Sequence, residues 1–178
     1  MREHTNSSAM VGLARNHVAQ HFHTDWSRRS ANFSSGVDCV TGNDYPEVLS
    51  PLKRLKAAGM KLAILSNGTP AMLAAAAANA GIADLLDAIL SVEEVNIYKP
   101  HPSVYGPVGE RLNVDAPRVC FVSSNGWDAY SAKAFGFRVL WCNRFGQAPE
   151  RIPETPDGQI ATLAELPGIA TVSRTKRT

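Results

Sequence analysis

The chain has 178 residues, of which 44% are hydrophobic and 19% charged, and its formal net charge is +2. This length and composition suit one globular domain with its own core, and the near-neutral charge does not indicate a nucleic-acid partner. No apolar run reaches the roughly 18 residues of a membrane-spanning helix, and the polar residues 1–10 lack the form of a secretion signal.

The cysteines give no sign of a disulfide framework. Cys39, Cys120 and Cys142 are odd in number and widely spaced. The last two stand in apolar runs and are interpreted as buried thiols. We therefore expect a reducing, cytoplasmic location.

Regular secondary structure is predicted from residue 46 onward. Leu52 and Leu55 belong to an apolar set with helical spacing, which Gly59 ends. Thr69 can cap a second helix, whose first turn accepts Pro70. Strands alternate with helices, which predicts an α/β fold with a parallel sheet covered on both faces. In chain order we expect helix 46–58, strand 61–65, helix 70–81, strand 88–91, helix 102–112, strand 119–123, helix 127–135 and strand 138–142.

The first part of the chain has a different character. Residues 9–22 are predicted to form a helix, and the Ser-, Asn- and Gly-rich residues 27–43 a loop. We expect three regions: an atypical segment 1–44, a core 45–168 and a disordered basic tail 169–178. Three histidines, His17, His21 and His23, could hold a metal ion. A solvated helix face is favoured because no cysteine or acid completes the ligand set.

Three clusters of polar residues lie after predicted strands. Two follow their strand directly, and the other lies in the loop after strand 88–91. Ser66-Asn67-Gly68 precedes a capped helix and could cradle an anion, or form an ordinary loop. Lys99, between Tyr98 and Pro100, could neutralise carboxylates, or be a surface lysine. Because chemistry in open α/β sheets collects at the carboxyl ends of strands, the order of these clusters favours one site.

The third cluster is the most informative one. In FVSSNGWDA, an apolar strand ends in Ser123 and Asn125, and Asp128 stands near the start of a helix. The helix dipole favours an ionised Asp128 at that place, which also suits a plain capping acid.

Taken together, these motifs resemble a known family. Four motifs are similar to the haloacid dehalogenase superfamily, and more narrowly to the type II (S)-2-haloacid dehalogenases. They are, in chain order, LAILSNG, YKP, FVSSNGWDA and FGFRVLWCNR. The resemblance covers residues 45–168. It implies a Rossmann-like three-layer core with a parallel sheet, and a helical cap.

The resemblance also implies roles for individual residues. Ser66 and Asn67 would bind the substrate carboxylate. Tyr105 and Trp127 would also contact the substrate. The residues implied in catalysis are Lys99, which would pair with the carboxylates of the site, and Ser123, Asn125 and Asp128, which would orient the nucleophile, the lysine and the hydrolytic water.

The family's chemistry is hydrolytic. The resemblance implies conversion of (S)-2-haloacids to (R)-2-hydroxyacids through an aspartyl ester, without a cofactor. Phosphatases of the superfamily carry an acid where this chain has Ser124, and Mg²⁺ favours carboxylate ligands, so we expect no metal. A metal-dependent phosphatase remains an alternative, and a homodimer is expected from the resemblance alone.

One departure from the family pattern is large. The nucleophilic aspartate belongs to an Asp-x-x-Gly-Thr motif after the first strand, and the nearest match is Asp38 in VDCVTG. The cap arginine cannot be assigned to Arg15, Arg28 or Arg29. The chain is expected to lack this motif and most of the cap, through truncation or a frameshift. A catalytically silent remnant or interaction module is therefore another alternative.

The same departure concerns the fold. We expect no central strand between those that end at Ser66 and Ser123, which would leave unpaired edges in mid-sheet. Residues 37–41, or a second chain, could fill that place.

Overall fold

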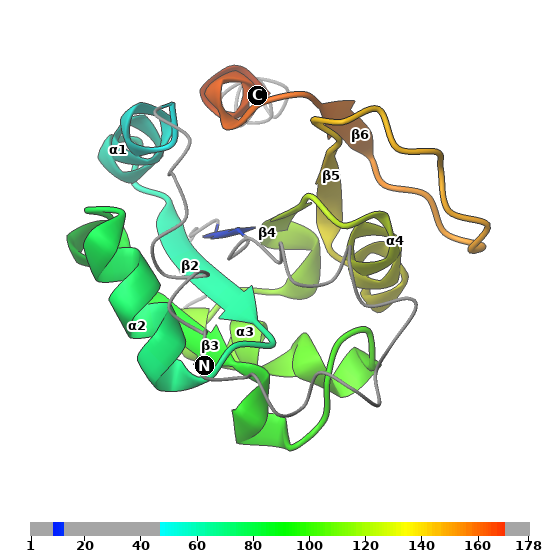
Figure 1. The fold of residues 1–178 in the computed structure, drawn as a ribbon, viewed down its shortest axis with the longest axis horizontal. Coiled ribbons are helices and arrows are strands. Elements are labelled where there is room, and N and C mark those ends of the chain that lie inside the picture. The colour runs from blue at the N-terminus through cyan, green and yellow to red at the C-terminus, as the bar shows by residue number, and fades with distance from the viewer. Residues whose placement is uncertain (1–8, 13–46, 170–178) are drawn as a thin grey trace, which may run out of the picture.

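The core of the protein is one parallel sheet of six strands in the order β3-β2-β1-β4-β5-β6 (Figure 1). The computed structural model describes residues 9–12 and 47–169. All five strand pairs are parallel. The strands are β1 (Ala9–Gly12), β2 (Lys61–Ser66), β3 (Ala88–Ser91), β4 (Val119–Ser123), β5 (Arg138–Cys142) and β6 (Gly158–Ile160).

Four α-helices and several short 3-10 helices connect the strands. The α-helices are α1 (Leu49–Ala57), α2 (Pro70–Asn79), α3 (Gly106–Leu112) and α4 (Gly126–Phe135). The 3-10 helices are η3 (Ala83–Leu85), η4 (Val92–Val95), η5 (Pro102–Val104), η6 (Ala116–Arg118) and η7 (Leu163–Glu165).

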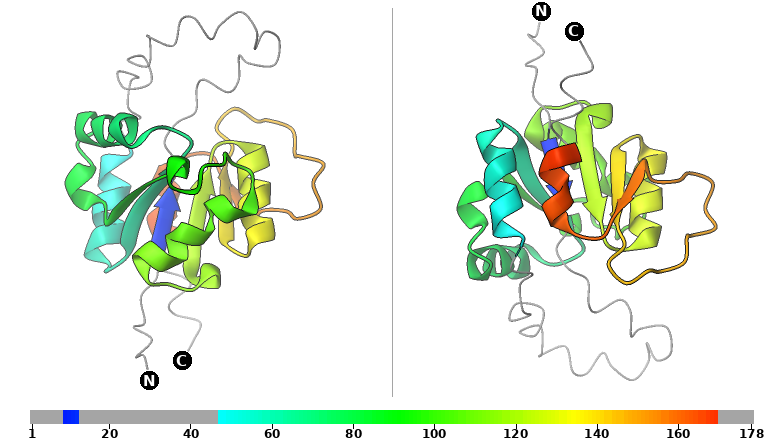
Figure 2. Two further views of the ribbon diagram at one scale, coloured as in Figure 1. Left: turned by 90° about the horizontal axis from the view of Figure 1, so that it is seen from below. Right: turned by 90° about the horizontal axis from the view of Figure 1, so that it is seen from above.

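Successive side chains of each strand serve opposite faces of the sheet, which gives three layers (Figure 2). In β2, Ala63 and Leu65 pack with α3 and α4. Leu62 packs with α1 and the segment after η7, and Ile64 with α2. The strand is therefore buried on both sides, as its continuous apolar run predicts.

Most predicted elements are confirmed, several of them to the residue. The side chain of Thr69 caps α2 by accepting a hydrogen bond from the Met72 N–H at 3.3 Å. The predicted helix 102–112 is divided into η5 and α3, with Tyr105 between them. Pro107 explains the division, since it has no N–H to donate and fits only a first turn.

The N-terminal prediction is wrong at residues 9–12. This segment was expected to be helical, yet β1 lies in the centre of the sheet, with β2 on one side and β4 on the other (Figure 1). The expected gap in mid-sheet is thus occupied by a four-residue apolar segment. Two parallel neighbours offer hydrogen-bonding edges on both sides, and such pairing outweighs local helix propensity.

Other predictions for the chain ends lie outside the described residues. They concern the helix beyond residue 12, the loop 27–43, the three histidines, Asp38, the candidate strand 37–41 and the tail beyond residue 169. The division of the chain at residue 45 stays a prediction. The edge strand β6, by contrast, was not predicted at all.

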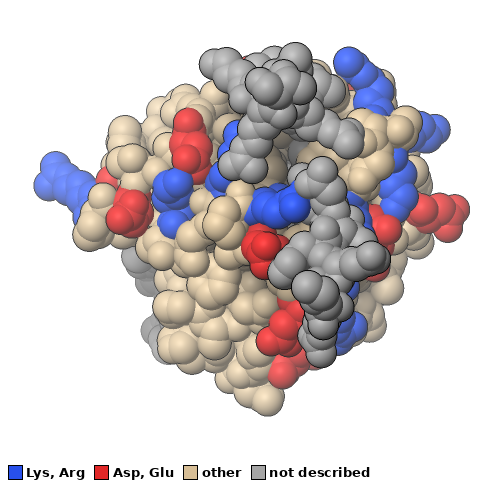
Figure 3. All heavy atoms as spheres, turned by 180° about the vertical axis from the view of Figure 1, so that it is seen from behind, with Lys and Arg blue, Asp and Glu red and all other residues tan. Residues whose placement is uncertain are grey.

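Two observations concern long apolar helices and surface charge. Within residues 9–12 and 47–169, no helix combines the length and apolarity needed to cross a bilayer. On the face shown in Figure 3, acidic and basic side chains of the described residues are interspersed.

Two aspartates fix the register of the sheet at the amino ends of its outer strands. Asp87 donates its N–H to the Leu62 carbonyl and accepts the Leu62 N–H on Oδ2, both at 2.7 Å. Asp157 repeats this exchange with Val139, at 2.9 and 2.7 Å. A lysine pairs with each carboxylate, Lys56 and Lys133 respectively.

These contacts lower the pKa of both aspartates. Burial raises the pKa of Asp157, but the hydrogen bonds from Lys133 and the Val139 N–H outweigh it. Burial likewise raises the pKa of Asp87, and the hydrogen bonds from Lys56 and the Leu62 N–H outweigh it. Both pKa values lie below the ordinary 3.8, so the clamps stabilise the fold above about that pH. The stabilisation is lost as the pH falls through the folded-state pKa.

We predict that Asp157→Ala lowers the free energy of unfolding by about 1–3 kcal/mol at pH 7, because the Val139 N–H loses its acceptor. Urea unfolding at pH 7 and pH 3 measures the effect, which should shrink at the lower pH. Asp115→Ala is the control, since Asp115 is exposed and makes no capping hydrogen bond. Equal losses in the two variants would contradict this role.

Candidate active site

The candidate site lies at the carboxyl ends of β2 and β4, the two strands that flank the central strand. The described pairing of β1 reaches Ile64 of β2 and Phe121 of β4. β2 and β4 continue to Ser66 and Ser123, which pair with Ser91 of β3 and Trp141 of β5. This is the edge of the sheet where α/β proteins bind ligands.

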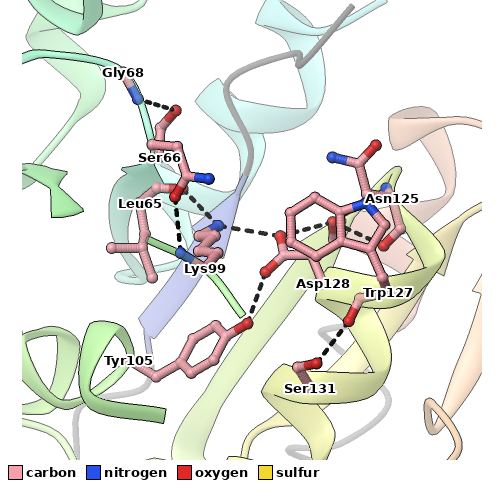
Figure 4. Close-up of polar contacts among 11 residues, drawn as sticks. Leu65, Ser66, Gly68, Lys99, Tyr105, Asn125, Trp127, Asp128 and Ser131 are labelled. Atoms are coloured by element: carbon pink, nitrogen blue, oxygen red, sulfur yellow. Dashed lines mark hydrogen bonds and ion pairs between the residues drawn. The ribbon is translucent and has the colours of Figure 1, made fainter. Parts of the chain in front are cut away.

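A buried ion pair lies at this edge. Lys99 Nζ is 3.0 Å from Asp128 Oδ2, and the side chains of Lys99 and Asp128 are only 3% and 1% exposed. The ammonium also donates to the Leu65 carbonyl at 3.0 Å, next to the end of β2. It stands 5.0 Å from the ring centroid of Phe121. Lys99 thus connects the end of β2 to α4 (Figure 4).

Three donors hold the Asp128 carboxylate. Oδ1 accepts the Tyr105 hydroxyl at 2.8 Å, and Oδ2 accepts the Ser123 hydroxyl at 2.9 Å besides the Lys99 ammonium. The residue lies in the first turn of α4, where the helix dipole favours a negative charge. Three donors thus fix the position of this carboxylate away from water.

The protein environment shifts the pKa of two groups in this network. Burial lowers the pKa of Lys99, and the charge and hydrogen bond of Asp128 act against that shift. Burial raises the pKa of Tyr105, and the Asp128 charge adds to it. Tyr105 is therefore protonated at neutral pH and donates its hydroxyl hydrogen to Asp128.

The loop after β2 is tied to Lys99 by its backbone. Asn67 Oδ1 accepts the Lys99 N–H at 3.0 Å, so the Asn67 amide nitrogen is left for another partner. Ser66 Oγ accepts the Gly68 N–H at 3.2 Å. The peptide bond between Lys99 and Pro100 is cis.

Ser91 is a residue that sequence reasoning missed. It is buried at the end of β3, and its hydroxyl donates to the Gly68 carbonyl at 2.8 Å. It thereby holds the loop that carries Ser66 and Asn67. A signal was present, because β2, β3 and β4 each end in serine and all three serines are buried.

Asn125 and Trp127 flank the ion pair on α4. The Asn125 N–H donates to Ser123 Oγ at 3.2 Å, while its buried Nδ2 has no partner among the described residues. Figure 4 shows the Asn125 amide on the opposite side of Asp128 from Tyr105. Trp127 is half-buried, and its carbonyl accepts the Ser131 hydroxyl at 2.7 Å.

The candidate site residues thus come together from four segments of the chain. Lys99, Tyr105, Ser123 and Asp128 form one hydrogen-bonded network, joined to Asn67 through the Lys99 backbone. The half-buried Ser124 contributes its carbonyl to the Trp141 indole at 3.4 Å. Within the part of the chain that the structure describes, no three His, Cys, Asp or Glu side chains are grouped as metal ligands.

Comparison with known proteins identifies the family and the fold. A family model described as haloacid dehalogenase-like hydrolase matches residues 14–136. The chain belongs to this family. Its sequence is 44% identical to an (S)-2-haloacid dehalogenase from Pseudomonas sp. (strain YL) over 67% of this chain and 51% of that protein. The chain spans about half the length of the curated relatives it matches.

Solved structures of the family share the described core. One is the L-2-haloacid dehalogenase from Xanthobacter autotrophicus with chloropropionic acid covalently bound. It has a TM-score of 0.68 and 38% identity, over 71% of this chain and 60% of that one. A haloacid dehalogenase-type phosphatase from Thermococcus onnurineus is also similar, with a TM-score of 0.63 and 30% identity, over 71% and 57%. The predicted α/β fold and family are therefore confirmed.

We predict that Tyr105→Phe lowers the free energy of unfolding by about 1–3 kcal/mol, because Asp128 Oδ1 loses a buried hydrogen bond. Urea unfolding at pH 7 measures the difference. Tyr98→Phe is the matched control, since Tyr98 is 67% exposed, and should stay within about 0.5 kcal/mol of the parent. A Tyr105→Phe variant as stable as the Tyr98→Phe variant would exclude a structural role for this hydroxyl.

Proposed function

We propose that the site serves the hydrolytic dehalogenation of (S)-2-haloacids. The observation that carries the proposal is the buried Lys99–Asp128 pair at the carboxyl ends of β2 and β4. The names of the similar proteins support it, since several are (S)-2-haloacid dehalogenases. One related structure has chloropropionic acid covalently bound, which fits covalent catalysis.

In this proposal, the residues after β2 receive the substrate. The Ser66 hydroxyl and the Asn67 amide nitrogen would bind the substrate carboxylate at the start of α2. Trp127 and Tyr105 would limit the space for the haloacid. Tyr105 is fully buried and bonded to Asp128, so it would act mainly by holding that carboxylate.

Lys99, Ser123, Asn125 and Asp128 would support the reacting groups. The Lys99 ammonium would stabilise a nucleophilic carboxylate. Asp128 holds that ammonium in place, and the Ser123 hydroxyl in turn holds Asp128. Asn125 Nδ2, which has no partner among the described residues, is a suitable donor to the hydrolytic water. Ser124 has no negative charge to offer Mg²⁺, and this favours a reaction without metal.

The proposed reaction has two steps. A carboxylate oxygen forms a bond to C2 of the haloacid while the carbon–halogen bond breaks, and halide leaves with the electron pair. Water then attacks the ester carbonyl and releases the 2-hydroxyacid, which regenerates the carboxylate. The first step inverts the configuration at C2 and the second step leaves C2 untouched, so an (S)-haloacid gives an (R)-hydroxyacid.

The identity of the nucleophile is the open point of this mechanism. β1 has the sequence Ala-Met-Val-Gly, and the first acidic residue after it is Asp25. Asp38, the nearest match to the family motif, lies outside the described residues. The absence of an acid in β1 and the twelve residues after it favours a second candidate, a catalytically silent interaction module.

Three further expectations remain proposals. A metal-dependent phosphatase is the alternative within the family, and the phosphatase from Thermococcus onnurineus shares the described core. A cytoplasmic location is supported by Cys120 and Cys142, which are free thiols. A homodimer rests on family resemblance alone.

The proposal is tested by halide release from (S)-2-chloropropionate. We predict release, unaffected by EDTA, from at least one of Gly12→Asp and Leu13→Asp, which place a carboxylate at or directly after the end of β1. The matched controls Gly12→Asn and Leu13→Asn carry the same shape without a nucleophile and should release none. If the parent chain is itself active, loss of halide release in Asp38→Asn identifies Asp38 as the nucleophile.

Two outcomes would contradict dehalogenation. Folded aspartate variants and a folded parent that all release no halide would favour the silent module. Release of phosphate from a phosphate ester that EDTA abolishes would identify a metal-dependent phosphatase.

A further inference from the structure

A buried hydroxyl ties the end of β3 to the loop after β2. Ser91 is the last residue of β3 and is only 4% exposed. Its Oγ donates to the Gly68 carbonyl at 2.8 Å and accepts the Glu93 N–H at 3.1 Å. A serine hydroxyl has one hydrogen to donate, and here Gly68 receives it. Ser91 therefore joins two backbone segments, the loop after β2 and the start of η4.

Gly68 is held on both sides of its own residue. Its N–H donates to Ser66 Oγ at 3.2 Å, and its carbonyl accepts the Ser91 hydroxyl. Because Ser66 Oγ accepts in this bond, the hydrogen of the Ser66 hydroxyl remains for another acceptor. Asn67 lies between the two, and its Oδ1 accepts the Lys99 N–H at 3.0 Å. The orientation of the Ser66 and Asn67 side chains therefore depends on the position of the Gly68 backbone.

The same contacts form a closed circuit with Lys99. Ser91 begins the segment that leads to Lys99, and its hydroxyl fastens this segment to the loop after β2. At the other end of the segment, the Lys99 N–H returns to Asn67, and the Lys99 ammonium donates to the Leu65 carbonyl at 3.0 Å. The segment is thus bound to the end of β2 at both of its ends. Such supporting hydrogen bonds fix the geometry of a site only when each of them is in place.

From these contacts we infer that Ser91 is a positioning residue, which acts through Gly68 on the two side chains that receive the substrate carboxylate. The inference rests on the proposed function, in which the Ser66 hydroxyl and the Asn67 amide bind that carboxylate. Without the Ser91 hydroxyl, the Gly68 carbonyl and the Glu93 N–H each lose a buried partner, so the loop shifts to find another one. The substrate carboxylate takes no part in bond making, so the loss weakens substrate binding and leaves the chemical step largely unchanged.

Amide hydrogen exchange in the parent chain and in Ser91→Ala tests the positioning without any turnover. We expect the Gly68 and Lys99 amide protons to exchange about tenfold faster in the variant, since about one buried hydrogen bond no longer holds the loop. The Val139 N–H, which Asp157 accepts at the opposite edge of the sheet, should exchange as in the parent. Ser91→Thr keeps a hydroxyl and should restore slow exchange at Gly68 and Lys99.

Ser131→Ala is the matched control. Ser131 also donates its hydroxyl to a backbone carbonyl, that of Trp127, at 2.7 Å. This carbonyl belongs to the same helix, α4, so the bond does not join two segments of the chain. The Gly68 and Lys99 amides should therefore exchange as in the parent. Should Ser91→Ala not fold, Ser91→Cys takes its place, because a thiol is a weaker donor and should give the same effects at smaller size.

Kinetics connect the loop to the substrate. In the form of the chain that releases halide, Ser91→Ala should raise KM for (S)-2-chloropropionate about tenfold, while kcat changes less than about twofold. Ser91→Thr should restore KM, and Ser131→Ala should leave it unchanged. A hydroxyl that served stability alone would not produce this split between KM and kcat.

Two results would overturn the inference. Exchange that accelerates equally at Gly68, Lys99 and Val139 would reduce Ser91 to a contributor to overall stability, and an unchanged KM in Ser91→Ala would separate the loop from substrate binding. Failure of the proposed function is distinguishable from both. If no form of the chain releases halide, dehalogenation fails, whereas the exchange rates at Gly68 and Lys99 still decide whether Ser91 positions the loop.

Discussion

A buried ion pair between Lys99 and Asp128 organises the polar end of the sheet. Lys99 stands on the segment between β3 and α3, and Asp128 on α4, so the pair joins two parts of the α/β core that are distant in sequence. Burying two charges costs several kcal/mol per ion, and the cost is offset only when each has further hydrogen bonds. Leu65, Tyr105 and Ser123 provide them.

Such a pair is better explained by function than by stability. Hydrophobic residues of similar volume often give equal or greater stability in a core. A fixed ammonium beside a fixed carboxylate, at the carboxyl edge of a parallel sheet, is instead the kind of preorganised field that supports charged reaction partners. The chain belongs to the haloacid dehalogenase-like hydrolases, and the four described residues of its central strand include no acid.

The sequence predicted the part of the fold in which local signals agree with tertiary structure. The apolar runs of β2, β3, β4 and β5 each end in a turn or helix signal, so their bounds were predicted closely. The Thr69 cap and Pro70 likewise determine where α2 begins. β1 could not be predicted, because Ala9–Gly12 is short and becomes a strand only through neighbours that are far away in the chain.

The candidate site, like the fold, was predicted from the sequence only in part. Order and spacing of the motifs predicted that Lys99, Ser123 and Asp128 lie together, since parallel strands end at one edge. Local sequence could not reveal the hydrogen bond from Tyr105 to Asp128 or from Ser91 to Gly68, because each partner is 23 positions away. The buried Asn125 Nδ2, which has no hydrogen-bond partner among the described residues, likewise became visible only in three dimensions.

A double-mutant cycle on Lys99 and Asp128 tests the central claim most directly. The free energies of unfolding of Lys99→Met, Asp128→Asn and the double variant are measured in urea at pH 7. We predict that each single variant loses about 3–5 kcal/mol and that the double variant loses clearly less than their sum, with a coupling of about 2–3 kcal/mol. Losses that simply add would contradict the account, because the two charges would then not depend on each other.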